Sequence, residues 1–364
     1  MTSLLSTSIS SNGNAMDSVD QETSGLPPGN PVVLPDEAVE AQGAQGVPSG
    51  DPSSVVVLNS GGLSINLIFD AAAMAAPASF RAGIQQAASL LSAAFSDKIT
   101  INLKIDYSGT GGGAAAGPDG GQWIGYSTVR SNLISNASPG DNTFNSLAAT
   151  SSLQGQSYVA VWNAQLKLWG MLGANDTTTD DGSATFATDI NPSLLVGVAL
   201  HELTHAMGRV PCGPQPDIFD FYRFTSVGSR LFSNGSTAPP SYFSLDGGST
   251  KLADFGQASD PSDFLNSGVQ GSTDSFNEYY TGSTLQQLTT VDLKQLVALG
   301  YHLASAIPPT VVESYGSTSL LQVGSAYVMA PVGTTTGPEL KYQGAPITTG
   351  QFPNWTLIGA EAVS

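Results

Sequence analysis

Hydrophobic side chains first become periodic near residue 63, where the pattern predicts a strand, a helix and a second strand. Apolar and polar residues alternate in Leu63–Phe69 and again in Ile99–Tyr107, which is typical of strands with one buried face. Between them, the apolar residues of Phe80–Phe95 recur every three or four positions and predict an amphipathic helix. This order and spacing indicate a crossover unit in a mixed sheet.

Shorter patterns follow this unit. The glycine-rich segment Gly109–Gly121 is predicted to be a flexible loop, and it lacks the lysine and the spacing of a phosphate-binding loop. Tyr126–Ala137 and Thr143–Ala149 are compatible with short helices, and Tyr158–Trp162 indicates a buried strand. Asp181–Asp189 is a short strand bounded by turn residues. It is either an ordinary paired strand or a sheet edge that takes an extended peptide as an added strand.

The largely apolar segment Leu194–Gly208 predicts a helix buried beneath a cleft. Asn191 suits the N-cap, and Pro192 suits the first helical position. At the other end, Gly208 suits the left-handed residue that follows a helix.

Within this helix lies the pattern H-E-x-x-H, formed by His201, Glu202 and His205. Residues four apart lie on one face of a helix, so both imidazoles can bind one metal ion, and zinc is the ion that the pattern favours. Glu202 is placed beside the metal rather than on it, where a general base is needed. Two buried histidines can also be ordinary core residues. However, two of the chain's three histidines flank this glutamate, which favours a metal site.

Composition narrows the class of partner. The 364 residues carry a net charge of −18, and the pI is near 4.1. Nucleic acids and anionic membrane surfaces are bound by basic patches, so neither is an expected partner, and no apolar run is long enough to span a bilayer. The single cysteine, Cys212, excludes an internal disulfide. We expect a soluble, secreted protein without an N-terminal Sec signal peptide.

A catalytic zinc ion usually has three protein ligands, so the two histidines need a partner. The downstream acids considered first are Asp217, Asp220 and Glu278. The longer pattern H-E-x-x-H-x-x-G-x-x-H is incomplete, because its last position is Pro211. Cys212 lies close to the helix, but a thiolate ligand would make zinc less Lewis acidic, which disfavours this residue.

Several separated motifs carry a resemblance to a known family. They are HELTHAMGR, DFYRF at Asp220–Phe224, SYFSLDGGSTKLADF at Ser241–Phe255, STDSFNEYY, and VDLKQLVALGY at Val291–Tyr301. In these motifs the chain resembles bacterial zincin-type, metzincin-like HExxH zinc metalloproteases over roughly Leu63–Tyr301. The resemblance implies a zincin-like α+β catalytic domain, in which a mixed twisted sheet supports the helix that carries H-E-x-x-H.

The family pattern also suggests further site residues. Asp220 stands where the family has a recurrent aspartate before an aromatic–arginine pair, so the resemblance implies Asp220 as the third zinc ligand. Asp217 and Glu278 are the reserve ligands, and Tyr222 or Arg223 is the implied transition-state stabiliser. A structural pairing of Asp220 with Arg223 is the alternative. Some relatives carry glutamate in place of the second histidine, whereas this chain has the complete pattern.

Composition divides the chain into three parts. Residues 1–57 are polar, acidic and rich in proline and glycine, which predicts a disordered leader, with a propeptide as the alternative. Residues 58–305 form the expected zincin-like domain. Residues 306–364 contain a linker and a partial β-rich segment that resembles modules appended to exported proteins of Gram-negative bacteria, often with type I secretion machinery. The chain stops within that pattern, so we expect a truncated gene or a fragment of a longer protein.

The expected function is that of a secreted zinc endopeptidase acting on protein or peptide substrates. Zinc activates a water molecule, and Glu202 takes its proton as general base and passes it to the leaving amine. Two alternatives stay open: a catalytically inactive relative that serves as an extracellular binding or adhesion module, and a zinc hydrolase of a non-peptide substrate. Asp260 and Asp263 are candidates for a structural Ca²⁺ site, with ordinary solvated acids as the alternative.

Overall fold

A crossover unit starts the central sheet, as the hydrophobic pattern predicts. Strands β4 (Ser64–Phe69) and β5 (Thr100–Tyr107) are parallel and pair in register from Ser64↔Thr100 to Phe69↔Ile105. Helix α2 (Ala78–Ala94) connects them, after the short helix α1 (Ala71–Ala75). The apolar stripe of α2 is buried against the sheet, so the strand–helix–strand prediction is confirmed.

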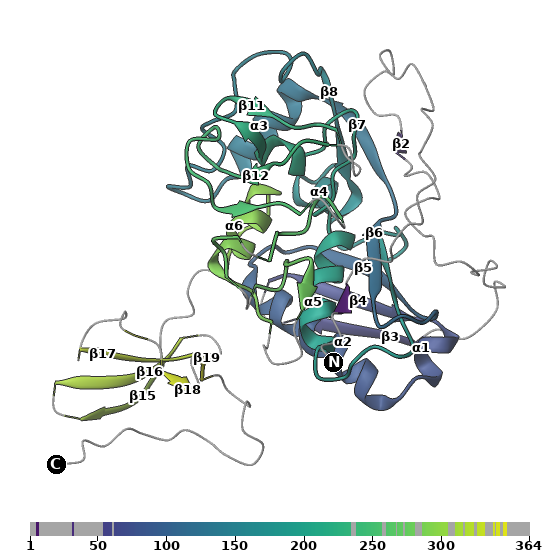
Figure 1. Cartoon of the computed structure of the whole chain (residues 1–364), viewed down its shortest axis with the longest axis vertical. Helices are drawn as coiled ribbons and strands as arrows, with labels where there is room; N and C mark the ends of the chain where they lie inside the picture. Colours follow the sequence, from purple (N-terminus) through teal and green to yellow (C-terminus); the bar gives the residue numbers. More distant parts are fainter. Residues whose placement is uncertain are drawn as a thin grey trace. The chain divides into compact units, whose positions relative to one another are not determined.

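The computed structural model describes residues 62–303 except 234–237, 257–259, 267, 272–273 and 281–285. It also describes strands at 5–6, 31–32 and 54–59 and parts of 304–347. The chain divides into two units, Met1–Leu303 and Ala304–Ser364. Both helices and sheets are present in the first unit, so the fold is of the mixed α+β class (Figure 1).

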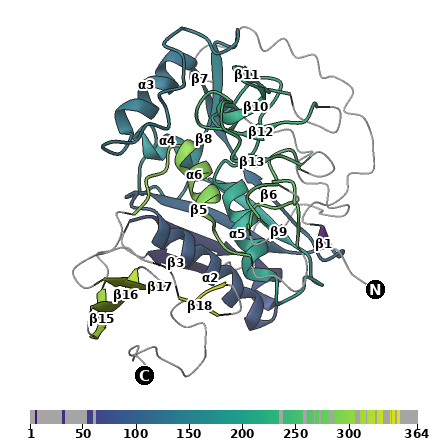
Figure 2. The same cartoon turned by 60° about the vertical axis from the view of Figure 1, so that its left-hand side comes forward.

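Three further strands complete a five-stranded sheet of order β3-β4-β5-β9-β6. Strand β3 (Ser54–Asn59) is antiparallel to β4 and crosses the boundary that we placed between residues 57 and 58. Strand β9 (Gly182–Phe186) is parallel to β5, and β6 (Ala114–Pro118) is antiparallel to β9 (Figure 2).

This sheet decides between two alternatives and corrects one expectation. The strand predicted within Asp181–Asp189 exists as β9 and pairs on both sides, so the ordinary paired strand is the alternative observed. The edge beside β9 is β6, which lies inside Gly109–Gly121, the segment predicted to be a loop. Its residues are alanine, glycine and proline, which show no alternation of polar and apolar side chains. Pairing of its backbone with β9 therefore makes the strand, and the side-chain pattern could not reveal it.

Helices α2 and α5 (Leu195–Ala206) pack against the sheet and against each other, and the main core lies between these layers (Figure 2). Helix α5 approaches the sheet very closely at Gly182 of β9. A Cβ atom at this glycine would lie 2.5 Å from the carbonyl oxygen of Ala206. Glycine is needed here because the sheet and the last turn of α5 leave no room for a side chain.

A smaller layer follows the first sheet in the chain. Strands β7 (Gly121–Gly125) and β8 (Tyr158–Trp162) pair with β2 (Pro31–Val32) in the order β2-β7-β8, flanked by α3 (Tyr126–Asn136) and α4 (Asn163–Leu168). The helix predicted over Tyr126–Ala137 and the strand over Tyr158–Trp162 are confirmed. The segment Thr143–Ala149 forms turns rather than a helix.

The chain after α5 forms short elements. A 3₁₀ helix (Phe219–Tyr222) precedes a four-stranded sheet of order β11-β10-β12-β13, with β10 (Arg223–Ser226), β11 (Ser229–Arg230), β12 (Tyr242–Phe243) and β13 (Ala253–Asp254). Strand β14 (Tyr279–Tyr280) pairs antiparallel with β1 (Leu5–Ser6). Helix α6 (Thr290–Ala298) begins with a capping box, in which Thr289 and Asp292 satisfy each other's backbone N–H groups.

The second unit contains β-structure in its described residues. Strands β15 (Thr310–Tyr315), β16 (Thr318–Val323) and β17 (Ala326–Pro331) form an antiparallel sheet, and β18 (Lys341–Tyr342) pairs with β19 (Ala345–Pro346). Across the part of the chain that the structure describes, no helix has the length and apolar character needed to cross a membrane.

His302, near the end of the first unit, forms polar contacts with Asp97 and Asn136. Its Nδ1 atom lies 2.5 Å from Asp97 Oδ1, and its backbone N–H donates to Asp97 Oδ2 at 2.9 Å. Its Nε2 atom faces the carbonyl oxygen of Asn136. Both ring nitrogens therefore face acceptors, which suits the doubly protonated imidazolium. The hydrogen bond with Asp97 raises the pKa of His302 above its ordinary value.

Stability is expected to depend on pH through His302. Because its pKa is raised on folding, the folded chain holds this proton more tightly than the unfolded chain does. The stabilisation is complete below the unfolded pKa of about 6.5 and is lost as the pH rises through the raised pKa of the folded chain. Urea unfolding of the wild type and His302→Gln, from slightly acidic to alkaline pH, should show a stability difference that shrinks with rising pH. A constant difference would contradict this assignment.

Candidate metal centre

Helix α5 carries both histidines of the H-E-x-x-H pattern. It begins at Leu195, later than predicted, because Asn191 caps the preceding turn instead of the helix: its Oδ1 accepts the Ser193 N–H at 3.0 Å. The predicted end is confirmed. Gly208 has a φ of +105°, a left-handed conformation that glycine adopts without strain and that ends the helix.

The two imidazole rings are oriented through their Nδ1 atoms. His201 Nδ1 lies 2.9 Å from the carbonyl oxygen of Ser275, and His205 Nδ1 lies 2.7 Å from that of Arg209. A carbonyl oxygen can only accept, so each Nδ1 carries the proton and each neutral ring has its lone pair on Nε2. Burial lowers the pKa of His201, which favours this neutral form. Both rings are thus held in the form in which histidine binds metals.

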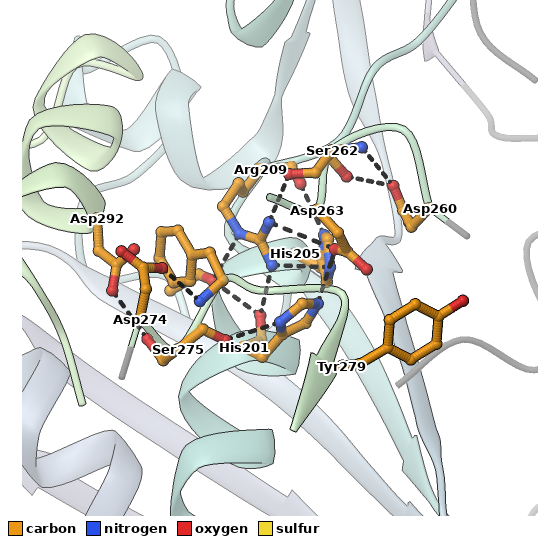
Figure 3. Close-up of polar contacts among 12 residues, drawn as sticks. His201, His205, Arg209, Asp260, Ser262, Asp263, Asp274, Ser275, Tyr279 and Asp292 are labelled. Atoms are coloured by element: carbon orange, nitrogen blue, oxygen red, sulfur yellow. Dashed lines mark hydrogen bonds and ion pairs between the residues drawn. The ribbon is translucent and has the colours of Figure 1, made fainter. Parts of the chain in front are cut away.

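A buried carboxylate, Asp263, meets these Nε2 atoms (Figure 3). Its Oδ1 lies 2.8 Å from His201 Nε2 and 3.2 Å from His205 Nε2. Neither oxygen of Asp263 receives a hydrogen bond, although its side chain is 1% exposed. Three electron-pair donors therefore converge on one point, which a cation placed among them would satisfy.

The separations fit a metal ion of zinc's size. Two ligands at the usual zinc bond length of about 2.0–2.1 Å and a tetrahedral angle lie about 3.3 Å apart. The separations of Asp263 Oδ1 from the two Nε2 atoms, 2.8 and 3.2 Å, both lie below that value, the second only slightly. Among the residues that the structure describes, His201, His205 and Asp263 are the group of three that could hold a metal ion. Two imidazole nitrogens and one carboxylate suit zinc better than calcium, which prefers oxygen ligands.

Asp263 replaces Asp220 in the three-residue group, which corrects the ligand choice made from the sequence. Asp220 is fully buried and pairs with Arg223, whose Nη1 donates to Asp220 Oδ1 at 2.6 Å. Its Oδ2 accepts the backbone N–H of Asp217 at 3.3 Å. Burial raises the pKa of Asp220 to about 6 despite the guanidinium. The pairing with Arg223, considered above as the structural alternative, is the one observed.

The other predicted site residues are also outside the three-residue group. Asp217 accepts hydrogen bonds from Trp162 Nε1 at 3.0 Å and from the Asp220 N–H at 3.1 Å. Tyr222 donates its hydroxyl to the carbonyl oxygen of Thr143 at 3.4 Å, and Arg223 donates to that of Ser233 at 3.0 Å. Glu278 is buried, and its backbone N–H donates to the carbonyl oxygen of Phe264 at 2.9 Å. Each therefore has a structural contact of its own.

The acids proposed for calcium have different surroundings. Asp263 belongs to the group with the histidines, whereas Asp260 Oδ1 accepts the Ser262 N–H at 2.7 Å. Asp260 thus closes the turn that presents Asp263. Cys212, the disfavoured thiolate ligand, has a pKa raised well above its ordinary value by burial and by nearby Asp217 and Asp220, so its thiol is held protonated.

Glu202 is the remaining polar residue of the pattern. It is 1% exposed, and its Oε1 has no hydrogen-bond partner. Burial, followed by the charge of Asp263, raises the pKa of Glu202 well above its ordinary value, and Arg209 opposes this. A buried carboxyl group with an unpartnered oxygen and a raised pKa has the properties of a group that exchanges protons.

Sequence reasoning missed three contributors to the site: Asp263 as a ligand, Ser275 and Arg209. Asp263 and Ser275 lie far downstream of α5, and no fixed spacing from the histidines marks them. Ser275 acts through its backbone carbonyl, which leaves no trace in residue type. Arg209 offered a signal, since an arginine directly after the helix-ending Gly208 is one of few cations in an acidic chain.

A hollow on the surface lies elsewhere. Its volume is about 520 Å³, and none of His201, Glu202, His205 and Asp263 lines it. The hollow is formed by Gln122, Ile124, Gly125, Ser127, Thr128, Ser157, Tyr158 and Met171. This hollow therefore gives no support for a small-molecule pocket at the metal centre.

Comparisons of the chain with family models, curated proteins and solved structures found no match.

Proposed function

We propose that this chain is a zinc-dependent endopeptidase. The observation that carries the proposal is the convergence of two histidine Nε2 lone pairs and the Asp263 carboxylate, beside the unpartnered carboxyl group of Glu202. The donor set matches catalytic zinc sites, which use three protein ligands and leave a position open.

The residues divide the work of peptide hydrolysis between them. His201, His205 and Asp263 would hold zinc, which when bound lowers the pKa of water and polarises a carbonyl group. Glu202 accepts a proton from the attacking water as its oxygen bonds to the carbonyl carbon. When the C–N bond breaks, Glu202 returns this proton to the leaving amine. The backbone carbonyls of Ser275 and Arg209 keep both rings oriented throughout.

Two features of the fold favour an extended peptide as substrate. Strand β6, an edge of the described sheet, packs against α5, so a peptide could add to it as a further strand. Strand β14 already pairs with an extended segment, Leu5–Ser6. This pairing is near the histidines, because the ring centres of Tyr280, in β14, and His201 are 6.3 Å apart. An H-E-x-x-H helix on a mixed sheet with an antiparallel edge also supports the zincin-like resemblance.

Removal of metal provides the first test. The protein is expected to lose hydrolysis of casein, an unstructured substrate, when a chelator removes its metal. Activity should return when one equivalent of zinc is added, because zinc lowers the pKa of the water from which Glu202 takes a proton. Casein hydrolysis that persists in the metal-free protein would contradict the proposal. Zinc binding without hydrolysis would instead favour the inactive binding relative or a non-peptide substrate.

The leader and the secretion route are also proposals. The pairing of Leu5–Ser6 with β14 supports the propeptide alternative for residues 1–57, because it places leader backbone beside Tyr280. If the zinc-loaded full chain is inactive, a variant lacking residues 1–53 should be assayed, and activity in this variant alone would identify a propeptide. We expect secretion without a Sec signal; fusion of residues 306–364 to a reporter would test a role in type I export.

A further inference from the structure

Arg209 is a buried cation at the candidate metal centre, and the chemistry proposed above leaves its side chain without a role. The side chain is fully buried. It follows Gly208, whose left-handed backbone ends α5 and turns the chain back, so that the Arg209 N–H donates to the carbonyl oxygen of Thr204 at 3.1 Å. This turn brings the guanidinium beside His201 and His205 (Figure 3).

The guanidinium of Arg209 contacts each of the segments that supply or orient His201, His205 and Asp263. On α5, its Nε donates to Thr204 Oγ1 at 3.0 Å and its Nη2 donates to the carbonyl oxygen of His201 at 3.2 Å. Its Nη1 donates at 2.9 Å to the carbonyl oxygen of Ser262, on the loop that carries the third carboxylate. The ring centre of Phe276, on the segment that orients His201, is 4.1 Å from the guanidinium carbon.

Arg209 also contacts two of the three proposed ligands. Its Nη2 donates to His205 Nε2 at 2.8 Å, a hydrogen bond that a metal ion bound at this nitrogen would replace, and its Nη1 lies 3.7 Å from Asp263 Oδ1. Its backbone oxygen accepts from His205 Nδ1 at 2.7 Å, which sets the tautomer. A buried carboxylate without a countercharge is strongly unfavourable. The positive charge of Arg209 therefore lowers the free energy of keeping Asp263 inside the cluster.

We propose that Arg209 is the positioning residue that holds Asp263 against the two histidines and so assembles the three-ligand site. The inference rests on the proposed function in one respect, namely that these three residues bind a metal ion. A guanidinium suits this task because its five donors form a rigid planar fork that reaches several segments at once. Lysine has a single nitrogen and cannot do the same.

The test compares two buried arginines. Zinc affinity of the full chain is measured by competition with a chromophoric chelator, and the visible spectrum of the cobalt(II)-loaded protein reports the coordination geometry. Arg209→Lys is expected to bind zinc about 10–100-fold more weakly, as loss of an outer-shell partner usually does, with an altered cobalt spectrum. Arg223→Lys is the matched control, because Arg223 is equally buried and ion-paired but outside the cluster; its affinity and spectrum should match the wild type.

A double substitution separates this role from general loss of packing. If Arg209 acts through Asp263, then adding Arg209→Lys to Asp263→Asn should weaken zinc binding little further. Additive losses, or a folded Arg209→Lys with wild-type affinity and spectrum, would overturn the proposal. Failure of the proposed metal site has a different signature: either the wild type does not bind zinc, or Asp263→Asn binds it as tightly as the wild type does.

Thr204→Val decides the matter if Arg209→Lys does not fold. This change keeps the side-chain shape but removes the hydroxyl that accepts from Arg209 Nε. Weaker zinc binding with an unchanged circular dichroism spectrum would support the positioning role. Unchanged zinc binding would overturn it.

Discussion

Glu202→Gln is expected to abolish peptide hydrolysis while the protein still binds zinc. The amide has nearly the shape of the carboxyl group but cannot accept a proton from water, so kcat should fall by about 10²–10⁴-fold, the usual contribution of a general base. Zinc content should stay at the wild-type level, because Glu202 is outside the three-residue group. Hydrolysis of a fluorogenic peptide, measured together with metal analysis of the same samples, gives both quantities.

Glu202→Gln is expected to stay folded, so unfolding should not account for its loss of activity. Burial raises the pKa of Glu202, so a charge at this position is unfavourable for folding, and the neutral amide of glutamine suits the same surroundings. The melting temperature of Glu202→Gln should therefore equal or exceed that of the wild type. Glu278→Gln is the matched control, since Glu278 is also a buried glutamate that lies outside the group. Equal activity in Glu202→Gln and the wild type would exclude the proposed mechanism.

Asp263→Asn is expected to weaken metal binding, whereas Asp220→Asn is expected to lower stability. Asp263→Asn removes a charged ligand. Zinc affinity should therefore fall further than the loss of about 10–100-fold that follows when a residue supporting a ligand is changed. Asp220→Asn should leave zinc affinity unchanged. Because it removes one partner of the buried pair with Arg223, it should lower the free energy of unfolding by about 3–5 kcal/mol at a pH where Asp220 is ionised.

Zinc titration and urea unfolding of both variants at pH 8 or above provide the comparison, since this range lies above the Asp220 pKa of about 6. Both aspartates are buried, so burial alone does not distinguish the variants. Loss of zinc binding in Asp220→Asn with retention in Asp263→Asn would restore the ligand choice based on the family resemblance and refute the one based on geometry.

Local patterns in the sequence were sufficient to predict several features of this protein. The crossover unit follows from residues that alternate or recur at helical spacing, as in Leu63–Phe69 and Phe80–Phe95. The meeting of His201 and His205 follows from one helical turn, and the helix end from the conformational freedom of Gly208. Each of these features depends on interactions within a few residues along the chain, which is why sequence spacing alone predicts them.

Tertiary structure decided which distant groups meet. Strand β6 is made by backbone pairing with β9 and has no side-chain pattern of its own. Asp220 and Asp263 are both aspartates before an aromatic residue, yet only Asp263 reaches the histidines, because Arg223 binds the carboxylate of Asp220. The sequence by itself therefore determined the helix, both histidines and the adjacent Glu202. The third carboxylate and the arginine beside it depended on how separate segments pack, because contacts across long loops leave no periodic trace in the chain.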